Sequence, residues 1–176
     1  MNQEHLKRAR RGEEWALQAL YDEARGRVFR LALAVLGDAG SAEEAMQDSL
    51  EYALTHLDRF DPDRSAWTTW LHTITISRCR DRLRRRRLLA LPLLGGLLAR
   101  DPPPERLAEQ RELTGSLHAA LLRLSPAVRE AVALRFLDEC SFIEIGRILG
   151  CGEKTAQSRV RIGLNKLRAL LEGDPA

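Results

Sequence analysis

The helical pattern of this 176-residue chain breaks between residues 88 and 112, and this break constrains the fold more than any other feature. Pro92, a Gly-Gly pair and the sequence DPPPE all fall within it. Proline removes a helical hydrogen bond and glycine lowers helix propensity, so no continuous helix can cross the segment. On both sides, apolar residues recur at steps of three and four, which is typical of amphipathic helices. The pattern predicts two small domains, 1–87 and 113–176, joined by a flexible linker at 88–112.

The residue usage favours helices on both sides of the break. Leucine and alanine are abundant, and only 5% of the residues are aromatic, which argues against sheets. Ser41 to Glu44 and Ser141 to Glu144 have the spacing of capping boxes, in which a serine hydroxyl and a glutamate satisfy the first free amides of a helix. We therefore expect an all-α protein with a helix beginning at each box.

The sequence contains no pattern of catalytic or metal-binding residues. Its four histidines are scattered, and its three cysteines (Cys79, Cys140 and Cys151) lack metal-ligand spacing and cannot all pair as disulfides. No apolar run follows the basic residues of the N-terminus, so a secretory signal is not indicated. We expect a cytoplasmic protein that is not an enzyme, with no catalytic residue, cofactor, metal or small-molecule substrate. A structural role is favoured for the cysteines over redox sensing, because free cysteine is commonly a small buried apolar residue.

Seven arginines stand among the ten residues from Arg78 to Arg87, directly before an apolar run from Leu88 to Ala99. A nucleic-acid arm, a membrane anchor and a hinge are three interpretations of this stretch. The apolar run has twelve residues, whereas a spanning helix needs about 20, so the anchor is not favoured. We expect the arginines to end a helix that faces DNA phosphates. We also expect a partner to cover Leu88 to Leu98, because exposed leucine runs are a liability.

The segment from Ser141 to Leu171 has the form of a helix-turn-helix. A short helix up to Gly150 is followed by the turn GCG and a long helix whose apolar stripe includes Val160 and Leu167. The polar residues off this stripe are of types that contact bases or phosphates: Lys154, Gln157, Ser158, Arg161 and Asn165, with Arg159 beside them. DNA binding is favoured over the alternative, a helical hairpin with a polar outer face.

The segment LSPAVREAVALRFLDECSFIEIGRILGCGEKTAQSRVRIGLNKLRALL resembles the promoter-binding C-terminal domain of bacterial sigma factors of the extracytoplasmic-function (ECF) type. Upstream, EEAMQDSLEYALTHLDRFDPDRSAWTTWLHTITISRCRDRLRRRR resembles the N-terminal domain of that family. The C-terminal match rests on Arg129, Ser141, Glu144, Ile145, Leu149, Gly150, Thr155, Ser158 and Arg159. The N-terminal match rests on Gln47, Asp48, Leu57, Phe60, Asp61, Arg64, Trp70, Leu71, Ile74, Cys79, Asp81 and Leu83. The chain departs from the family pattern at Leu50, Leu54, Thr75–Ser77 and Cys151–Gly152.

The resemblance implies three partners: core RNA polymerase, promoter DNA and an anti-sigma factor, which is membrane-bound in many members. It assigns the acidic helix face to core polymerase, through Glu44, Gln47, Asp48 and Glu51. The residues at the −10 promoter element would be Asp61, Arg64, Ser65, Ser77, Arg78, Arg80, Arg82 and Arg84. The residues at the −35 element would be Lys154, Thr155, Gln157, Ser158, Arg159, Arg161 and Asn165. By this resemblance, Asp61 to Ser65 forms a pocket for a base flipped from the non-template strand.

Two other functions stay open on the sequence alone. A repressor or activator would bind duplex DNA through the helix-turn-helix without polymerase, and its N-terminal half would serve for oligomerisation. A pure interaction module would bind one protein through the acidic helix, and its basic segments would only be solvated. Promoter binding that needs core polymerase and weakens with salt distinguishes a sigma factor from both.

Overall fold

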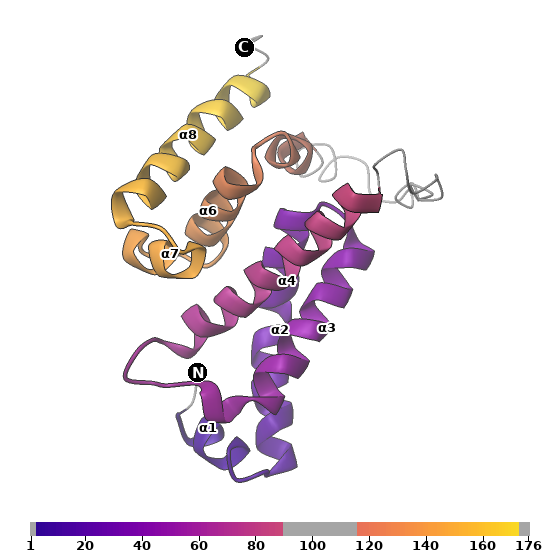
Figure 1. Cartoon of the computed structure of the whole chain (residues 1–176), viewed down its shortest axis with the longest axis vertical. Coiled ribbons are helices and arrows are strands. Elements are labelled where there is room, and N and C mark those ends of the chain that lie inside the picture. The colour runs from indigo at the N-terminus through magenta and orange to yellow at the C-terminus, as the bar shows by residue number, and fades with distance from the viewer. Residues whose placement is uncertain (1–2, 90–115, 173–176) are drawn as a thin grey trace.

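The computed structural model describes residues 3–89 and 116–172, and within them it contains helices and no strand (Figure 1). The prediction of an all-α protein is confirmed. Residues 3–89 contain α1 (Gln3–Ala9), α2 (Glu14–Leu36), α3 (Ala39–Thr55), the 3₁₀ helix η1 (Leu57–Arg59) and α4 (Trp67–Leu89). Residues 116–172 contain helical turns over 116–122, then α6 (Pro126–Leu137), α7 (Phe142–Leu149) and α8 (Glu153–Leu171). From residue 90 onward the predicted linker lies outside the described residues, so the boundaries at 87 and 113 stay predictions.

Helices α2, α3 and α4 pack side by side and form the N-terminal half of the structure (Figure 1). Their shared core includes Leu20 of α2, Leu50 of α3 and Leu71 of α4, each almost fully buried. Phe60 follows η1 and lies edge-on to the Trp67 ring, with the ring centroids 5.4 Å apart. The aromatic residues thus attach the start of α4 to the end of η1, and the segment between them is presented at one end of the half.

The start of α3 differs from the sequence prediction. Asp38 caps the helix, because its side chain accepts a hydrogen bond from the Ser41 amide at 2.8 Å. The expected capping box at Ser41 to Glu44 is therefore wrong. Gly37, with φ of 89°, closes α2 early enough for α3 to begin at Ala39, two residues before the expected cap. The second capping box is confirmed, since Ser141 and Glu144 exchange hydrogen bonds at the start of α7.

Helices α7 and α8 form the predicted helix-turn-helix. Gly150, with φ of 68°, ends α7 in the left-handed conformation that glycine adopts without strain. Gly146 allows a close approach, because a Cβ there would lie 2.7 Å from the carbonyl oxygen of Cys151. Where α8 crosses α6, a Cβ on Gly163 would lie 2.4 Å from a methyl carbon of Val132. These contacts hold α8 closely against both neighbouring helices.

The two halves of the structure share a buried core. Ile76 of α4 lies in one apolar cluster with Leu134 of α6 and Ile145 of α7. An ion pair between Arg80 of α4 and Glu130 of α6 crosses the same boundary. The predicted two helical domains are thus packed against each other in the described residues.

The membrane-anchor interpretation gains no support from the described helices. None of those in residues 3–89 and 116–172 is both long and apolar enough to cross a membrane. Leu88 and Leu89 end α4 with about half of their surface exposed. The remainder of the apolar run, and with it the expected cover over Leu88 to Leu98, lies outside the described residues.

Candidate nucleic-acid and polymerase interfaces

Helix α8 carries its predicted −35 residues on a solvent-facing surface. Ala156, Val160, Gly163 and Leu167 are buried against α6 and α7, so the remaining positions point outward. Five of the predicted residues are exposed and two are half-buried: Lys154, Thr155, Gln157, Arg161 and Asn165, then Ser158 and Arg159. Within the described part of the chain, no carboxylate forms an ion pair with the Lys154, Arg159 or Arg161 side chain, although Arg159 donates to the Cys151 sulfur at 3.5 Å.

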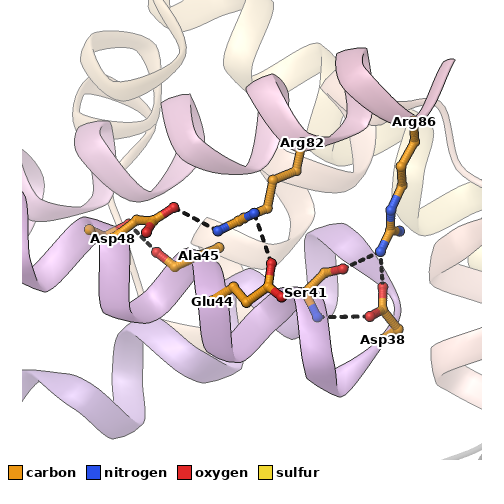
Figure 2. A network of polar contacts seen from close by, with 8 residues as sticks. Asp38, Ser41, Glu44, Ala45, Asp48, Arg82 and Arg86 are labelled. Atoms are coloured by element: carbon orange, nitrogen blue, oxygen red, sulfur yellow. Dashed lines mark hydrogen bonds and ion pairs between the residues drawn. The ribbon is translucent and has the colours of Figure 1, made fainter. Parts of the chain in front are cut away.

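The arginines of α4 are in a different state, because α3 supplies carboxylates along the line where the two helices meet (Figure 2). Arg82 donates to Glu44 at 3.0 Å and to Asp48 at 2.6 Å. One turn further along α4, Arg86 pairs with Asp38 and also contacts the Ser41 hydroxyl. We call this line of contacts the α3–α4 seam; it is made of Asp38, Ser41, Glu44 and Asp48 on α3 and Arg82 and Arg86 on α4.

The contacts of the seam lower the pKa of the Asp38 carboxyl group. Partial burial acts to raise its pKa, but hydrogen bonds from Arg86 and Ser41 outweigh this and hold the pKa below its usual value. Asp38 thus stays ionised, so one residue both caps α3 and binds α4.

Two further arginines of the predicted DNA-binding row are also paired. Arg80 makes a two-pronged contact with Glu130, at 2.9 and 2.7 Å, and only 2% of the Glu130 side chain is exposed. These hydrogen bonds raise the pKa of Arg80. Arg84 pairs with Asp81 on its own helix at 2.7 Å, where both side chains are largely accessible. The Arg80 contact therefore holds a buried carboxylate between the halves, whereas the Arg84 contact is an ordinary surface pair.

The four predicted polymerase-binding residues lie on the exposed side of α3: Glu44, Gln47, Asp48 and Glu51. Glu44 and Asp48 remain 67% and 53% exposed although both contact Arg82. Gln47 and Glu51 lie on the same helix face with exposed side chains. The seam therefore leaves carboxylate oxygens on this face accessible to a basic partner.

The predicted base pocket lies in the turn between η1 and α4. The Asp61 side chain accepts from the Asp63 amide at 3.0 Å, and its carbonyl oxygen accepts from the Arg64 and Ser65 amides at 3.3 Å. Asp61 and Arg64 are exposed and Ser65 is half-buried. Ser77, also predicted at −10 DNA, is exposed on α4. The turn is thus ordered by its own hydrogen bonds, with side chains open to solvent.

A cluster around Tyr52 was not predicted from the sequence. The His56 ring stacks on the Tyr52 ring with centroids 4.3 Å apart, and Arg59 donates to the Tyr52 hydroxyl at 2.9 Å. The guanidinium carbon of Arg78 lies 5.0 Å from the centroid of the same ring. The spacing of Tyr52 and His56 on α3 was the available signal, but only the fold adds the two arginines.

A second polar group, around Asp138, joins the halves. Asp138, with 3% of its side chain exposed, lies 3.3 Å from Arg27 of α2 and 3.2 Å from His72 of α4. Cys140 contacts the other His72 nitrogen at 3.7 Å. The partners are far apart in the sequence, so no local pattern predicted the group.

The cysteines that lie in the core are unreactive by their surroundings. Burial raises the pKa of Cys79 to about 12 and that of Cys140 to about 11, which keeps both thiols protonated at neutral pH. All three cysteines are free, and the described residues contain no group of histidine, cysteine and acidic side chains that could hold a metal. The preference for a structural role is consistent with this burial for Cys79 and Cys140.

Family models place both halves of the chain in one class. Residues 20–88 match Sigma-70 region 2, and residues 114–167 match Sigma-70 region 4. A helical region 2 followed by a helix-turn-helix region 4 defines an RNA polymerase sigma factor. The chain belongs to the ECF family of these factors, as its relatives indicate. It therefore acts with core RNA polymerase in promoter recognition and transcription initiation, and sigma factors are not enzymes in themselves.

The relatives match three quarters or more of the chain. The ECF sigma factor SigW of Bacillus subtilis is 26% identical over 97% of both chains. The sigma factor CnrH of Cupriavidus metallidurans is 30% identical over 75% of this chain and 74% of its own length. The structure of CnrH in complex with the cytosolic domain of CnrY has a TM-score of 0.74, with 24% identity and 97% of both chains covered. The structure of RpoE with the anti-sigma factor NepR from Bartonella quintana has a TM-score of 0.69, with 26% identity over 92% of this chain and 98% of that chain.

Proposed function

We propose that this sigma factor reads its promoter at two places and binds core polymerase through a third surface. In this division, α8 contacts the −35 element, the Asp61–Ser65 turn and α4 contact the −10 element, and the acidic face of α3 contacts polymerase. The observation that carries the proposal is the contrast in charge and exposure: a basic, unpaired face on α8 and an accessible acidic face on α3.

At the −35 element, α8 would lie in the major groove with its apolar stripe turned away from DNA. Arg161 and Lys154 are suited to phosphates or guanine, Gln157 and Asn165 to adenine, and Ser158 to a backbone oxygen. The close packing at Gly146 and Gly163 supports this role, because it fixes the direction of the helix before DNA arrives.

At the −10 element, the Asp61–Ser65 turn would receive the flipped base, whose unstacking costs a few kcal/mol. Arg78, Arg80, Arg82 and Arg84 would hold phosphates beside it, together with Ser77. Three of these arginines now contact carboxylates. DNA binding at α4 therefore involves an exchange of carboxylate for phosphate, and the release of Arg80 would leave the buried Glu130 carboxylate without its cation.

An anti-sigma factor is the proposed inhibitor. The support is the likeness to RpoE, whose structure was solved with the anti-sigma factor NepR. An inhibitor that covers the acidic face of α3 or the face of α8 would block polymerase or DNA. A cytoplasmic location and a membrane-bound inhibitor belong to the same proposal. Limited proteolysis tests the expected cover over the linker. Protection of Leu88 to Leu98 by polymerase or inhibitor would support it, and equal cleavage with and without them would contradict it.

The decisive experiment is reconstituted transcription. Purified protein with core RNA polymerase should give specific run-off transcripts from members of a randomised promoter library. Gln47→Ala with Glu51→Ala should weaken core binding without disturbing the seam, since neither side chain pairs with Arg82. Glu43→Ala, at an exposed neighbouring position, is the matched control. Absence of core binding by the wild-type protein would refute the proposal, and tight operator binding without polymerase would favour a conventional repressor or activator.

A further inference from the structure

The contacts between α3 and α4 continue one turn beyond the α3–α4 seam, but there the partner of the arginine is the Tyr52 ring and not a carboxylate. Arg78, Arg82 and Arg86 follow one another at four-residue steps along α4. Opposite Arg86 and Arg82, α3 presents carboxylates, but opposite Arg78 it presents the Tyr52 ring. Within the described residues Arg78 has no carboxylate partner, and its Nε is buried without a hydrogen-bond acceptor. Arg78, one turn before the seam on α4, therefore lacks the carboxylate partner that Arg82 and Arg86 have.

A second guanidinium group lies at the same ring. Arg59 donates to the Tyr52 hydroxyl at 2.9 Å, and its guanidinium carbon is 6.0 Å from the ring centroid. No ion pair of Arg59 occurs in residues 3–89 or 116–172, and its side chain is exposed. Three exposed carboxylates close in the sequence, Glu51, Asp58 and Asp61, form no ion pair with either arginine in the described residues. Two positive charges thus converge on one tyrosine without compensation.

The rings hold the two arginines in place. His56 stacks on Tyr52, and its Nδ1 lies 2.9 Å from both the Tyr52 carbonyl oxygen and the Thr55 hydroxyl. Cation–π contact with the tyrosine ring restricts Arg78, while the hydroxyl group restricts Arg59. Because the groups are ordered in advance, an anion that binds them loses little free energy in fixing flexible side chains.

We propose that Tyr52, His56, Arg59 and Arg78 form a binding site for a backbone phosphate of single-stranded promoter DNA. Arg59 and Arg78 bind the phosphate, and Tyr52 and His56 are positioning residues. Arg59 stands two residues before Asp61, so a strand whose base enters the Asp61–Ser65 turn carries its neighbouring phosphates past the cluster. Of these four residues, only Arg78 was predicted at −10 DNA from the sequence. The site rests on the proposed function, because that function brings the strand to this turn.

Salt titration of promoter binding tests the site. The probe is holoenzyme, formed from the full chain and core polymerase, with a forked promoter fragment whose −10 non-template strand is single-stranded. Each phosphate contact contributes about 0.7 to the slope of log affinity against log salt for a single strand. Arg59→Gln should lower the slope by part of this amount, and Arg59→Gln with Arg78→Gln should lower it by about 0.7 in total, because both side chains bind one phosphate. Arg25→Gln, which removes an exposed charge on α2, is the control and should leave the slope unchanged.

Neutral methylphosphonate linkages locate the contact. Each linkage near the −10 element is replaced in turn, and the wild-type holoenzyme should lose affinity at one or two positions. Arg59→Gln should lose less affinity at those positions than the wild type does, and a double-mutant cycle measures this difference as coupling. Tyr52→Phe keeps the ring and loses the hydroxyl, so it should weaken the coupling to Arg59 while leaving core binding unchanged.

Two results separate the site from the function. Normal holoenzyme formation and promoter binding, with the same salt slope in Arg59→Gln as in Arg25→Gln and no coupled linkage, would overturn the phosphate site alone. Failure of the wild-type chain to form holoenzyme would overturn the proposed function, and the site with it. An equal loss for fully duplex and forked fragments would also count against a single-strand contact.

Discussion

The two basic surfaces of this sigma factor differ in whether their charges already have partners. On α8, Lys154 and Arg161 face solvent without a carboxylate in the described residues. On α4, Arg80, Arg82, Arg84 and Arg86 each contact an acidic side chain. A row of arginines is therefore insufficient to identify a free DNA-binding face.

The difference separates two kinds of recognition. The α8 face can meet duplex DNA without rearrangement, so its affinity depends on shape and on phosphates as they stand. The α4 arginines contact carboxylates in the free protein, so the proposed DNA binding there would include the free energy of the contacts that are broken. Reading of the −35 element should then be insensitive to the packing of the two halves, while reading of the −10 element should depend on it.

The largest effect is expected for the ion pair between Arg80 and Glu130, which joins the two halves. Arg80→Ala leaves the Glu130 carboxylate buried without its cation, and we expect the free energy of unfolding to fall by about 3 kcal/mol. Arg84→Ala removes a surface pair and should cost less than about 0.5 kcal/mol. Urea unfolding of the full chain measures both. Similar costs for the two variants would mean that Arg80 is as free as an ordinary surface arginine.

The rigidity of the α8 face is tested at Gly146 of α7, which packs against the turn before α8. Gly146→Ala places a Cβ against the Cys151 carbonyl oxygen, and we expect a loss of stability of about 2 kcal/mol and weaker −35 binding. Gly152→Ser is the control, because the space around Gly152 is open and serine is a good helix cap. Thermal unfolding and binding of a −35 duplex by holoenzyme provide the two readouts. If Gly146→Ala bound DNA normally, a preformed α8 face would not be needed.

Matched arginine variants compare the surfaces directly. Arg161→Ala should leave the unfolding free energy unchanged and lower the salt slope for duplex −35 DNA by about 0.9. Arg82→Ala should do the reverse: stability falls by about 1 kcal/mol through the lost contacts to Glu44 and Asp48, and −35 binding is unchanged. A stability loss in Arg161→Ala would show that α8 also has intramolecular partners.

The smallest test concerns the capping box of α7. Hydrogen bonds from the Ser141 hydroxyl and amide lower the pKa of Glu144, so its stabilising effect is present above the unfolded pKa of about 4.3 and is lost as the pH falls through the folded pKa. Glu144→Gln should cost about 1 kcal/mol at pH 7, and the difference from wild type should narrow below about pH 4. Unfolding curves between pH 7 and 3 measure this, with Glu153→Gln as control. A constant difference would exclude the charge as the cause.

Sequence reasoning succeeded where a single helix contains the information. The α8 face follows from one apolar stripe, and the capping box of α7 from two residues three apart. The partners of the α4 arginines could not be predicted, because Glu44, Asp48 and Glu130 stand 34 to 50 positions away from them. The helical period predicts the direction in which an arginine side chain of α4 points. Its partner is determined only by the packing of α3 and α6 against α4.

The cap of α3 was predicted wrongly and the Tyr52 cluster was not predicted, and the two reasons are related. Ser41 and Glu44 have the spacing of a capping box, yet Asp38 competes for the same amides and also gains Arg86. Tyr52 lies near the apolar side of α3, so its sequence pattern resembles that of a core residue. Its contact with Arg59 and Arg78 depends on how η1 turns the chain back toward α4.

The buried carboxylate of Glu130 also has an evolutionary consequence. A change at Arg80 alone leaves a negative charge inside the protein, so the two positions should change together among relatives. Arg80 lies in the part of the chain that matches region 2, and Glu130 in the part that matches region 4. Sequence changes in one region are thereby coupled to sequence changes in the other. Chimaeras that join region 2 of one relative to region 4 of another should be most stable when both residues of this pair come from the same parent.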